Sequence, residues 1–248
     1  MKVLGVIPAR YESTRFPGKP LVNIQGKSMI ARVYERCRQA KMLDEVIVAT
    51  DDQRIYDHVK SFGGEVMMTS KSHRSGTDRC AEVAAEHREV EFVVNIQGDE
   101  PFIDPNQIDQ LVKLFDGSST VDIATLAKKI DSEEALMDPN IVKVVFNKQA
   151  EALYFSRSTI PFVRNLASGQ WLRHHDFYKH IGIYAFRNKV LQECAKLPQG
   201  KLEIMESLEQ LRWLEAGYNI SVGLTKLETM GIDTPEDLEK FETKNELL

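Results

Sequence analysis

The stretch Gly5–Leu21, GVIPARYESTRFPGKPL, carries three cations that could bind phosphate. Arg10, Arg15 and Lys19 are spread among Ser, Thr, Gly and Pro residues, which favour a loop over a helix or a strand. Positive side chains and backbone amides in such a loop can converge on the oxygens of a polyphosphate. The plain alternative is a solvated, Arg-rich loop without a ligand.

Two carboxylates lie in segments that could face the same ligand. Asp99, in QGDEP, follows an apolar run, and Asp233 lies in GIDTPEDLE. Mg²⁺ prefers one or two carboxylates together with substrate phosphates and water, although either aspartate could instead cap a helix or a turn. One Mg²⁺ held by two carboxylates and facing three cations is the arrangement that nucleotidyl transfer requires. The predicted catalytic residues are Lys19, Arg15, Asp99 and Asp233, with Asp99 and Asp233 as metal ligands.

Weaker candidates lie further along the chain. Alternation along a strand places His180 and Tyr184 on one face, where they could line a sugar pocket or simply fill the core. Arg157 follows a strand and could bind a carboxylate through two hydrogen bonds, but it could also be a surface residue. Glu209 and Gln210 are expected in the middle of a helix, where most polar side chains face water.

Strands are needed to position these residues. Short apolar runs alternate with amphipathic helical segments in the first half of the chain, which predicts an α/β fold: a doubly wound, mostly parallel, Rossmann-like sheet. Such sheets bind ligands outside the carboxyl ends of their strands, where the cationic loop and Asp99 are expected. The strands are expected at Lys2–Ile7, Glu45–Thr50, Glu65–Thr69 and Glu91–Ile96.

Helix boundaries and the second half of the chain give further expectations. Ser28 is expected to cap a helix that runs to about Met42, Thr77-Asp78 to cap another, and Asp104-Pro105 to begin a third. Glu203–Ala216 is expected to be one helix. Strand-like runs after Ile123 come with fewer helices, which predicts an inserted β-rich lobe at about residues 141–187 within a single domain, residues 1–248.

Composition and charge limit the classes of binding partner and the cellular compartment that we expect for this protein. The 248 residues have a net charge of −5, which argues against general nucleic-acid binding because that usually needs a basic face. No apolar run approaches the roughly 20 residues of a membrane-spanning helix, and no signal peptide is recognised, so a cytoplasmic protein without a membrane partner is expected. Cys37, Cys80 and Cys194 are far apart and are interpreted as reduced thiols.

With these residues assembled, the chain closely resembles the 3-deoxy-manno-octulosonate (Kdo) cytidylyltransferases. The resemblance runs nearly end to end through seven blocks in order: IPARYESTRFPGKPL, SGTDR, VNIQGDEP, YFSRSTIPF, HIGIY, LEQLR and GIDTPEDLE. It implies an enzyme that uses Mg²⁺ to transfer CMP from CTP to the anomeric hydroxyl of Kdo, for lipopolysaccharide biosynthesis. The acceptor could instead be 8-amino-Kdo, and a CMP-acylneuraminate synthetase is the nearest alternative family.

The resemblance also implies site residues and an assembly. A homodimer built through the inserted lobe is expected. The nucleotide is expected at Ala9, Arg10, Arg15, Lys19, Ser75, Gly76, Thr77 and Arg79. The sugar is expected at Gln97, Arg157, His180, Tyr184, Glu209 and Gln210.

Overall fold

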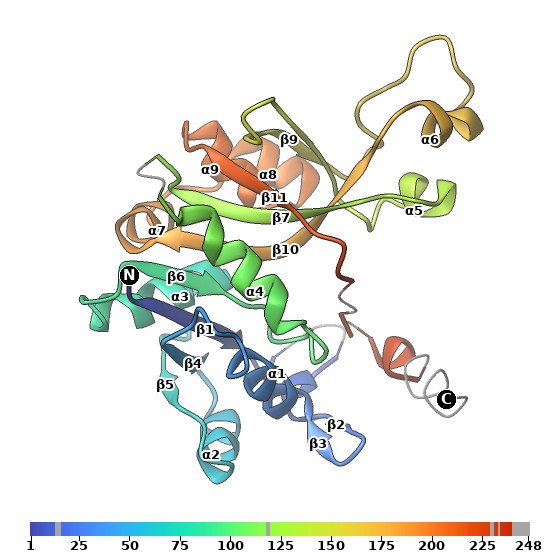
Figure 1. Ribbon diagram of the computed structural model, residues 1–248. Helices are drawn as coiled ribbons and strands as arrows, with labels where there is room; N and C mark the ends of the chain where they lie inside the picture. The colour runs from blue at the N-terminus through green and yellow to red at the C-terminus, as the bar shows by residue number, and fades with distance from the viewer. Residues whose placement is uncertain (13–15, 118–119, 229–230, 233, 240–248) are drawn as a thin grey trace. The chain divides into compact units, whose positions relative to one another are not determined.

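The computed structural model describes residues 1–12, 16–117, 120–228, 231–232 and 234–239 (Figure 1). The chain divides into two compact units, one formed by Met1–Asp109 with Glu228–Leu248 and the other by Gln110–Leu227. The single domain expected from the sequence stays a prediction. No helix in the described part of the chain is long and apolar enough to cross a membrane.

The first unit is built on a parallel sheet. Its strands lie in the order β6 (Phe92–Asn95), β1 (Val3–Ala9), β4 (Glu45–Thr50), β5 (Val66–Met68), and each neighbouring pair is parallel. Both faces of β1 are covered: Leu4, Val6 and Ile7 have no exposed surface. The apolar runs of the sequence therefore form buried parallel strands, as predicted.

Three helices connect these strands. They are α1 (Met29–Cys37), α2 (Gln53–Ser61) and α3 (Gly76–Glu86). The chain adds β4 and β5 on one side of β1 and then returns to place β6 on the other. Because such crossovers are right-handed, α1 and α2 cover one face of the sheet and α3 covers the other. The strand order thus reverses between β1 and β6, which is where doubly wound sheets bind their ligands.

Local sequence explains the helix starts. The Ser28 hydroxyl accepts the Ala31 amide at 3.3 Å, which confirms it as the cap of α1, although the helix ends at Cys37 rather than near Met42. The cap of α3 is Ser75, not Thr77-Asp78. Ser75 and Asp78 form a reciprocal capping box, in which each side chain binds the other's backbone amide.

The segment after the cationic loop completes the first unit. It contains the short helix η1 (Lys19–Leu21) and the hairpin β2 (Asn23–Ile24) and β3 (Lys27–Ser28). Ile24 and Met29 pack with Ile232 in a small buried cluster, so the C-terminal segment is fixed against this hairpin. The helix α4 (Pro105–Val112) begins at the predicted proline and η2 (Lys113–Phe115) continues the chain into the second unit.

The second unit has a mixed sheet. Strand β7 (Ile123–Lys129) pairs in parallel with β11 (Ile220–Leu224) and antiparallel with β10 (Tyr178–Arg187). Strands β8 (Lys143–Phe146) and β9 (Ala152–Ser156) form an antiparallel pair, and β8 also joins β10. The predicted strand-rich character of this part of the chain is confirmed.

The helices of the second unit are α5, η3, α6, α7, α8 and α9, at Glu133–Met137, Ser168–Gln170, Trp171–His174, Asn188–Cys194, Lys201–Glu206 and Gln210–Glu215. The predicted single helix Glu203–Ala216 is wrong: Ser207 adopts a left-handed conformation with φ of 53° and ends α8. Trp171 and Phe177 form a separate buried cluster with Ile130 and Leu136. This cluster gives the segment between β9 and β10 a core of its own.

Candidate active site

A pocket of about 370 Å³ lies outside the carboxyl ends of β1 and β6 in the first unit. It is lined by residues 8–10, 12, 19 and 20 from the end of β1 and the loop after it, residues 74–76 at the start of α3, and residues 97–99 after β6. These segments are far apart in the sequence and meet where the strand order of the sheet reverses. The pocket therefore occupies the position that the fold reserves for a nucleotide.

Lys19 and Asp99 are joined at the edge of this pocket. The Lys19 Nζ donates to Asp99 Oδ2 at 2.7 Å, and their side chains are 14% and 30% exposed. Gly18, with φ of 73°, is the cap of η1 and turns the chain so that Lys19 begins that helix. A cation and a carboxylate that keep access to the pocket can bind, respectively, phosphate oxygens and a metal ion.

Two glycines allow the pocket-lining segments to approach one another. A Cβ on Gly98 would lie 2.8 Å from the Pro8 carbonyl oxygen, and a Cβ on Gly76 would lie 3.1 Å from Pro8 Cγ. The turn after β6 and the start of α3 are therefore packed directly on the end of β1. The first backbone amides of α3 carry partial positive charge, so Ser75 and Gly76 add favourable electrostatics for a phosphate.

The other predicted nucleotide-binding residues either line this pocket or are buried in the first unit. Ala9 and Arg10 line it, whereas Thr77 and Arg79 are 1% and 0% exposed. Arg79 donates to Thr69 Oγ1 at 2.5 Å and to Asp51 Oδ2 at 2.9 Å, which fixes the loop before α3. Direct contacts of Thr77 and Arg79 with a nucleotide stay a prediction.

Arg15 and Asp233 lie outside the described residues. The backbone just before Asp233 is described: Ile232 donates its amide to the Asp99 carbonyl at 2.9 Å and is fully buried. Residues 231–232, from the far end of the chain, are thus hydrogen-bonded to the segment that carries Asp99.

Asp99 fits the requirements of a magnesium ligand. Its carboxylate is partly exposed in a pocket that also holds cations able to bind phosphates, and Mg²⁺ typically takes only one or two carboxylates with phosphate and water. Within the described ranges, no group of three or more His, Cys, Asp or Glu side chains is arranged to hold a metal by itself.

A second set of predicted residues comes together in the second unit. The His180 Nε2 and the Thr125 hydroxyl are 2.9 Å apart, and the His180 and Tyr184 ring centroids are 5.2 Å apart. Burial lowers the pKa of His180 to about 3, so the ring is neutral at physiological pH. Burial, followed by the charge of Glu209, raises the pKa of Tyr184 well above its usual value. Gln210 is 5% exposed at the start of α9.

Tyr184 carries the strongest indication of a ligand in this set. Its hydroxyl is buried and has no hydrogen-bond partner among the described residues. The same holds for Nε1 of Trp213, whose ring packs edge-on against Tyr184 with centroids 5.0 Å apart. Thr125 and Trp213 were not predicted, and only the alternation of β7 and the apolar pattern of α9 mark them as buried. Gln97, the remaining sugar-binding candidate, lies in the first unit and lines its pocket.

Arg157 is held by main-chain oxygens. Its Nε donates to the Glu206 carbonyl at 2.7 Å, and its terminal nitrogens donate to the carbonyls of Pro139 and Ser207 at 3.2 and 3.4 Å. The fully buried Lys143 adds a hydrogen bond of 2.8 Å to the Arg157 carbonyl. Arg157 thus joins the end of α8 to the loop before β8, and a carboxylate contact for it stays a prediction.

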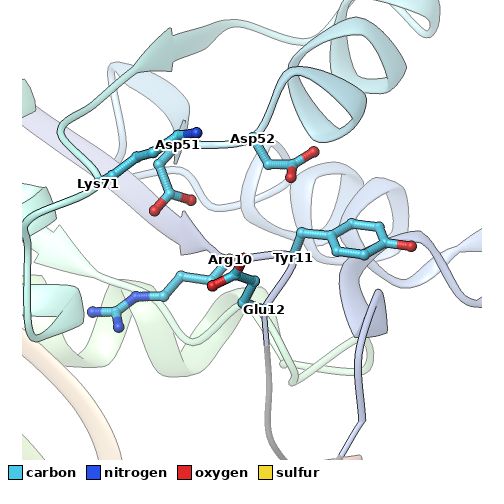
Figure 2. Close-up of a pocket in the computed structure, with 6 residues that line it drawn as sticks. All are labelled: Arg10, Tyr11, Glu12, Asp51, Asp52 and Lys71. Atoms are coloured by element: carbon cyan, nitrogen blue, oxygen red, sulfur yellow. The ribbon is translucent and has the colours of Figure 1, made fainter.

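A second, smaller pocket of about 180 Å³ adjoins the first. Figure 2 shows its lining: Arg10, Tyr11 and Glu12 from the loop after β1 face Asp51 and Asp52 from the end of β4, with Lys71 beside Asp51. Arg10 and Glu12 line both pockets. The cationic loop is therefore in contact with the start of α2 as well as with the ends of β1 and β6.

Comparison with known proteins agrees with this geometry. Residues 4–222 match the family described as cytidylyltransferase. The chain is 58% identical to the 3-deoxy-manno-octulosonate cytidylyltransferase of Parabacteroides distasonis over 245 residues, 97% of this chain and 96% of the relative. It is 55% identical to the Bacteroides thetaiotaomicron protein of the same name over 246 residues, 98% of this chain and 97% of that protein.

A solved structure shows the same likeness in three dimensions. It is that of a CMP:2-keto-3-deoxy-manno-octonic acid synthetase complexed with CTP, with a TM-score of 0.90 and 45% sequence identity, and the match covers 100% of both chains. The resemblance seen in the seven sequence blocks is therefore confirmed over the whole fold. On these grounds the chain belongs to the 3-deoxy-manno-octulosonate cytidylyltransferase family.

Proposed function

We propose that the protein transfers CMP from CTP to the anomeric hydroxyl of Kdo and releases pyrophosphate, as a cytoplasmic step of lipopolysaccharide biosynthesis. The observation that carries this proposal is the Lys19–Asp99 pair at 2.7 Å on the edge of a pocket at the switch point of the sheet. The names of the relatives and the CTP complex of a 45% identical structure support the choice of nucleotide and sugar.

The residues of the first unit would hold the triphosphate. Arg10 and Lys19 neutralise charge on the phosphates, and the backbone amides at the start of α3 add hydrogen bonds without a side chain in the way. Lys19 is also placed to stabilise the charge that develops when pyrophosphate leaves. Arg15 is proposed for the same task on the basis of the family resemblance.

Asp99 and Asp233 would hold Mg²⁺. When bound, the ion would neutralise phosphate charge and lower the pKa of the attacking sugar hydroxyl. Asp99 keeps its carboxylate oriented through Lys19, whose ammonium donates to Oδ2. Direct attack of the sugar hydroxyl requires no covalent nucleophile, so the remaining work of the chain is to align that hydroxyl with the α-phosphate.

The second unit would hold the sugar. The neutral His180 and the buried hydroxyl of Tyr184, which has no hydrogen-bond partner in the described part of the chain, offer hydrogen bonds to sugar hydroxyls. Glu209 and Gln210 lie at the start of α9, and the charge of Glu209 acts on Tyr184. Gln97 and Arg157 complete the proposed set by family resemblance. A polar group without a partner is costly in a buried position, so a bound hydroxyl would be well placed to satisfy Tyr184.

We also propose a homodimer through residues 141–187. Leu153 and Phe162 in this range are 61% and 77% exposed, which is unusual for large apolar side chains. Light scattering after size exclusion would give the mass of two chains of 28.3 kDa each. A mass of one chain at micromolar concentration would contradict the dimer.

The experiment that tests the function is pyrophosphate release across a panel of substrates. The four ribonucleoside triphosphates are each paired with Kdo, 8-amino-Kdo and N-acetylneuraminate in the presence of Mg²⁺, and the sugar nucleotide is identified by mass. The proposal predicts the highest kcat/KM for CTP with Kdo. Preference for another triphosphate, or for N-acetylneuraminate, would refute it.

A further inference from the structure

The cationic loop needs support from outside itself, and the structure supplies it at the start of α2. The loop leaves β1 at Arg10 and returns at Lys19, and most of its residues are polar. Near its second end, Phe16 packs against the cluster of Ile24, Met29 and Ile232, and Tyr11 is the large aromatic residue at its first end. A contact that holds Tyr11 in place therefore affects the positions of Arg10 and Lys19.

The Arg54 side chain is locked by Asp52. The Asp52 carboxylate accepts hydrogen bonds from Arg54 Nε at 2.9 Å and from a terminal nitrogen at 2.6 Å. Asp52 Oδ1 also accepts the Arg54 backbone amide at 2.9 Å, as the cap of α2. The Asp52 carboxylate thus holds the Arg54 guanidinium in one orientation, although the Arg54 side chain is 58% exposed.

The locked guanidinium lies on the Tyr11 ring. Arg54 Cζ is 3.3 Å from the ring centroid, a stacked cation–π contact. Figure 2 shows the Tyr11 ring lying on the Asp52 side of the loop while Arg10 extends the other way. Gly18 also lies close to the ring, because a Cβ added there would be 3.3 Å from it. Tyr11 is therefore close to both Arg54 and Gly18.

The backbone closes the loop at the same place. Gly18 donates its amide to the Tyr11 carbonyl at 2.9 Å, so the two ends of the loop are joined where the ring is held. The next residue is Lys19, which begins η1 and pairs with Asp99. A continuous chain of contacts thus runs from the α2 cap to the catalytic lysine.

We propose that Arg54 is a positioning residue, which stacks on Tyr11 and so keeps Tyr11 and Gly18 together, so that Arg10 and Lys19 meet the triphosphate. This role rests on the proposed function, since it acts on the same pocket. Arg54 does not line that pocket, and it contributes through Tyr11 and Gly18 rather than by touching the nucleotide.

The test compares Arg54→Ala with matched variants. Arg54→Ala leaves the Asp52 cap intact, because that cap uses the backbone amide of residue 54. Arg54→Lys keeps the charge but loses the planar stack and the forked pairing. Tyr11→Phe keeps the ring, and Tyr11→Leu removes it. Lys60→Ala, which removes an exposed cation and its pairing with Glu65 from the far end of α2, is the control.

Two measurements decide the outcome. Three variants, Arg54→Ala, Arg54→Lys and Tyr11→Leu, are expected to lower kcat/KM for CTP by about tenfold, because misplacement of a catalytic group by a fraction of an ångström has effects of that order. Their KM for the sugar and their melting temperature are expected to stay close to those of wild type. Tyr11→Phe and Lys60→Ala are expected to match wild type. In the ligand-free protein, hydrogen exchange of the peptide that contains Gly18 is expected to be faster in Arg54→Ala than in Lys60→Ala.

Unchanged exchange at Gly18, or a kcat/KM for CTP within twofold of Lys60→Ala, would overturn the proposal. The exchange measurement needs no substrate, so it decides whether Arg54 holds the loop even if the wild-type protein fails to make CMP-Kdo. Absence of product from wild type would overturn the proposed function instead.

Discussion

Gly98→Ala tests whether the close packing of the turn after β6 on the end of β1 sets the position of Asp99. Gly98 has no positive φ, so the substitution introduces no backbone strain and acts through space alone. The new methyl group would lie 2.8 Å from the Pro8 carbonyl oxygen. Pro8 belongs to β1, which pairs with strands on both sides, so the turn must move rather than the strand.

The size of the movement follows from the contact distance. To reach ordinary van der Waals contact at 3.4 Å the methyl group must retreat by about 0.6 Å, and Asp99 is the next residue. Overpacking of this kind typically costs about 1–3 kcal/mol of folding stability. Because displacement of a catalytic group by about 1 Å can cost about 100-fold in rate, we expect kcat to fall by about tenfold.

The assay is steady-state pyrophosphate release with CTP, Kdo and Mg²⁺, together with thermal unfolding. Gly169→Ala is the control, because its methyl group would meet only the flexible Glu133 side chain at 3.4 Å. Gly98→Ala is expected to lose turnover, whereas Gly169→Ala retains it. If Gly98→Ala shows the kcat of the control, the position of Asp99 does not depend on this contact and the reasoning is refuted.

Further predictions concern the metal, the second unit and pH. Chelation of divalent ions should abolish pyrophosphate release and added MgCl₂ should restore it; a full rate in excess EDTA would exclude the metal role of Asp99. Arg212→Ala should lower the free energy of unfolding by about 3–5 kcal/mol, measured by urea denaturation, because it leaves the Glu203 carboxylate buried without the two hydrogen bonds of 2.5 and 2.7 Å that Arg212 donates; a loss below about 1 kcal/mol would contradict this. Burial lowers the pKa of His180 to about 3, so the unfolded chain binds its proton first and stability should fall as pH drops from about 6.5 towards 3. Between pH 6.5 and 3, the unfolding free energy of His180→Gln should depend on pH less steeply than that of wild type, by up to about 1.4 kcal/mol per pH unit. A slope equal to that of wild type would refute the lowered pKa of His180.

The sequence predicted the part of the fold that local patterns determine. Apolar runs, the Ser28 cap and the Asp104-Pro105 helix start depend on near neighbours, and the structure confirms them. The break between α8 and α9 was missed because Ser207 adopts a left-handed conformation that its residue type does not favour. The cap of α3 was misplaced by two residues because Ser75, Thr77 and Asp78 are all good caps, and only the backbone geometry selects Ser75.

Contacts between residues far apart in the sequence could not be predicted from local sequence patterns. Lys19 and Asp99 were both predicted, but their hydrogen bond spans 80 positions and follows from the strand order of the sheet. The stack of Arg54 on Tyr11 gave no signal, since an exposed arginine at the start of a helix is ordinary. Arg157 was expected near the sugar because of the family resemblance, and that contact stays a prediction; its hydrogen bonds to main-chain oxygens gave no local signal, because only the fold brings those oxygens near.

The most direct test of the account is the kinetics of Lys19→Ala with CTP and Kdo varied independently. The proposed role of Lys19 is to stabilise phosphate charge, so kcat should fall by about 100-fold or more, while the KM for Kdo stays within twofold of wild type. An unaltered kcat with a changed KM for Kdo would show that Lys19 binds the sugar rather than the triphosphate, and would contradict the proposed site.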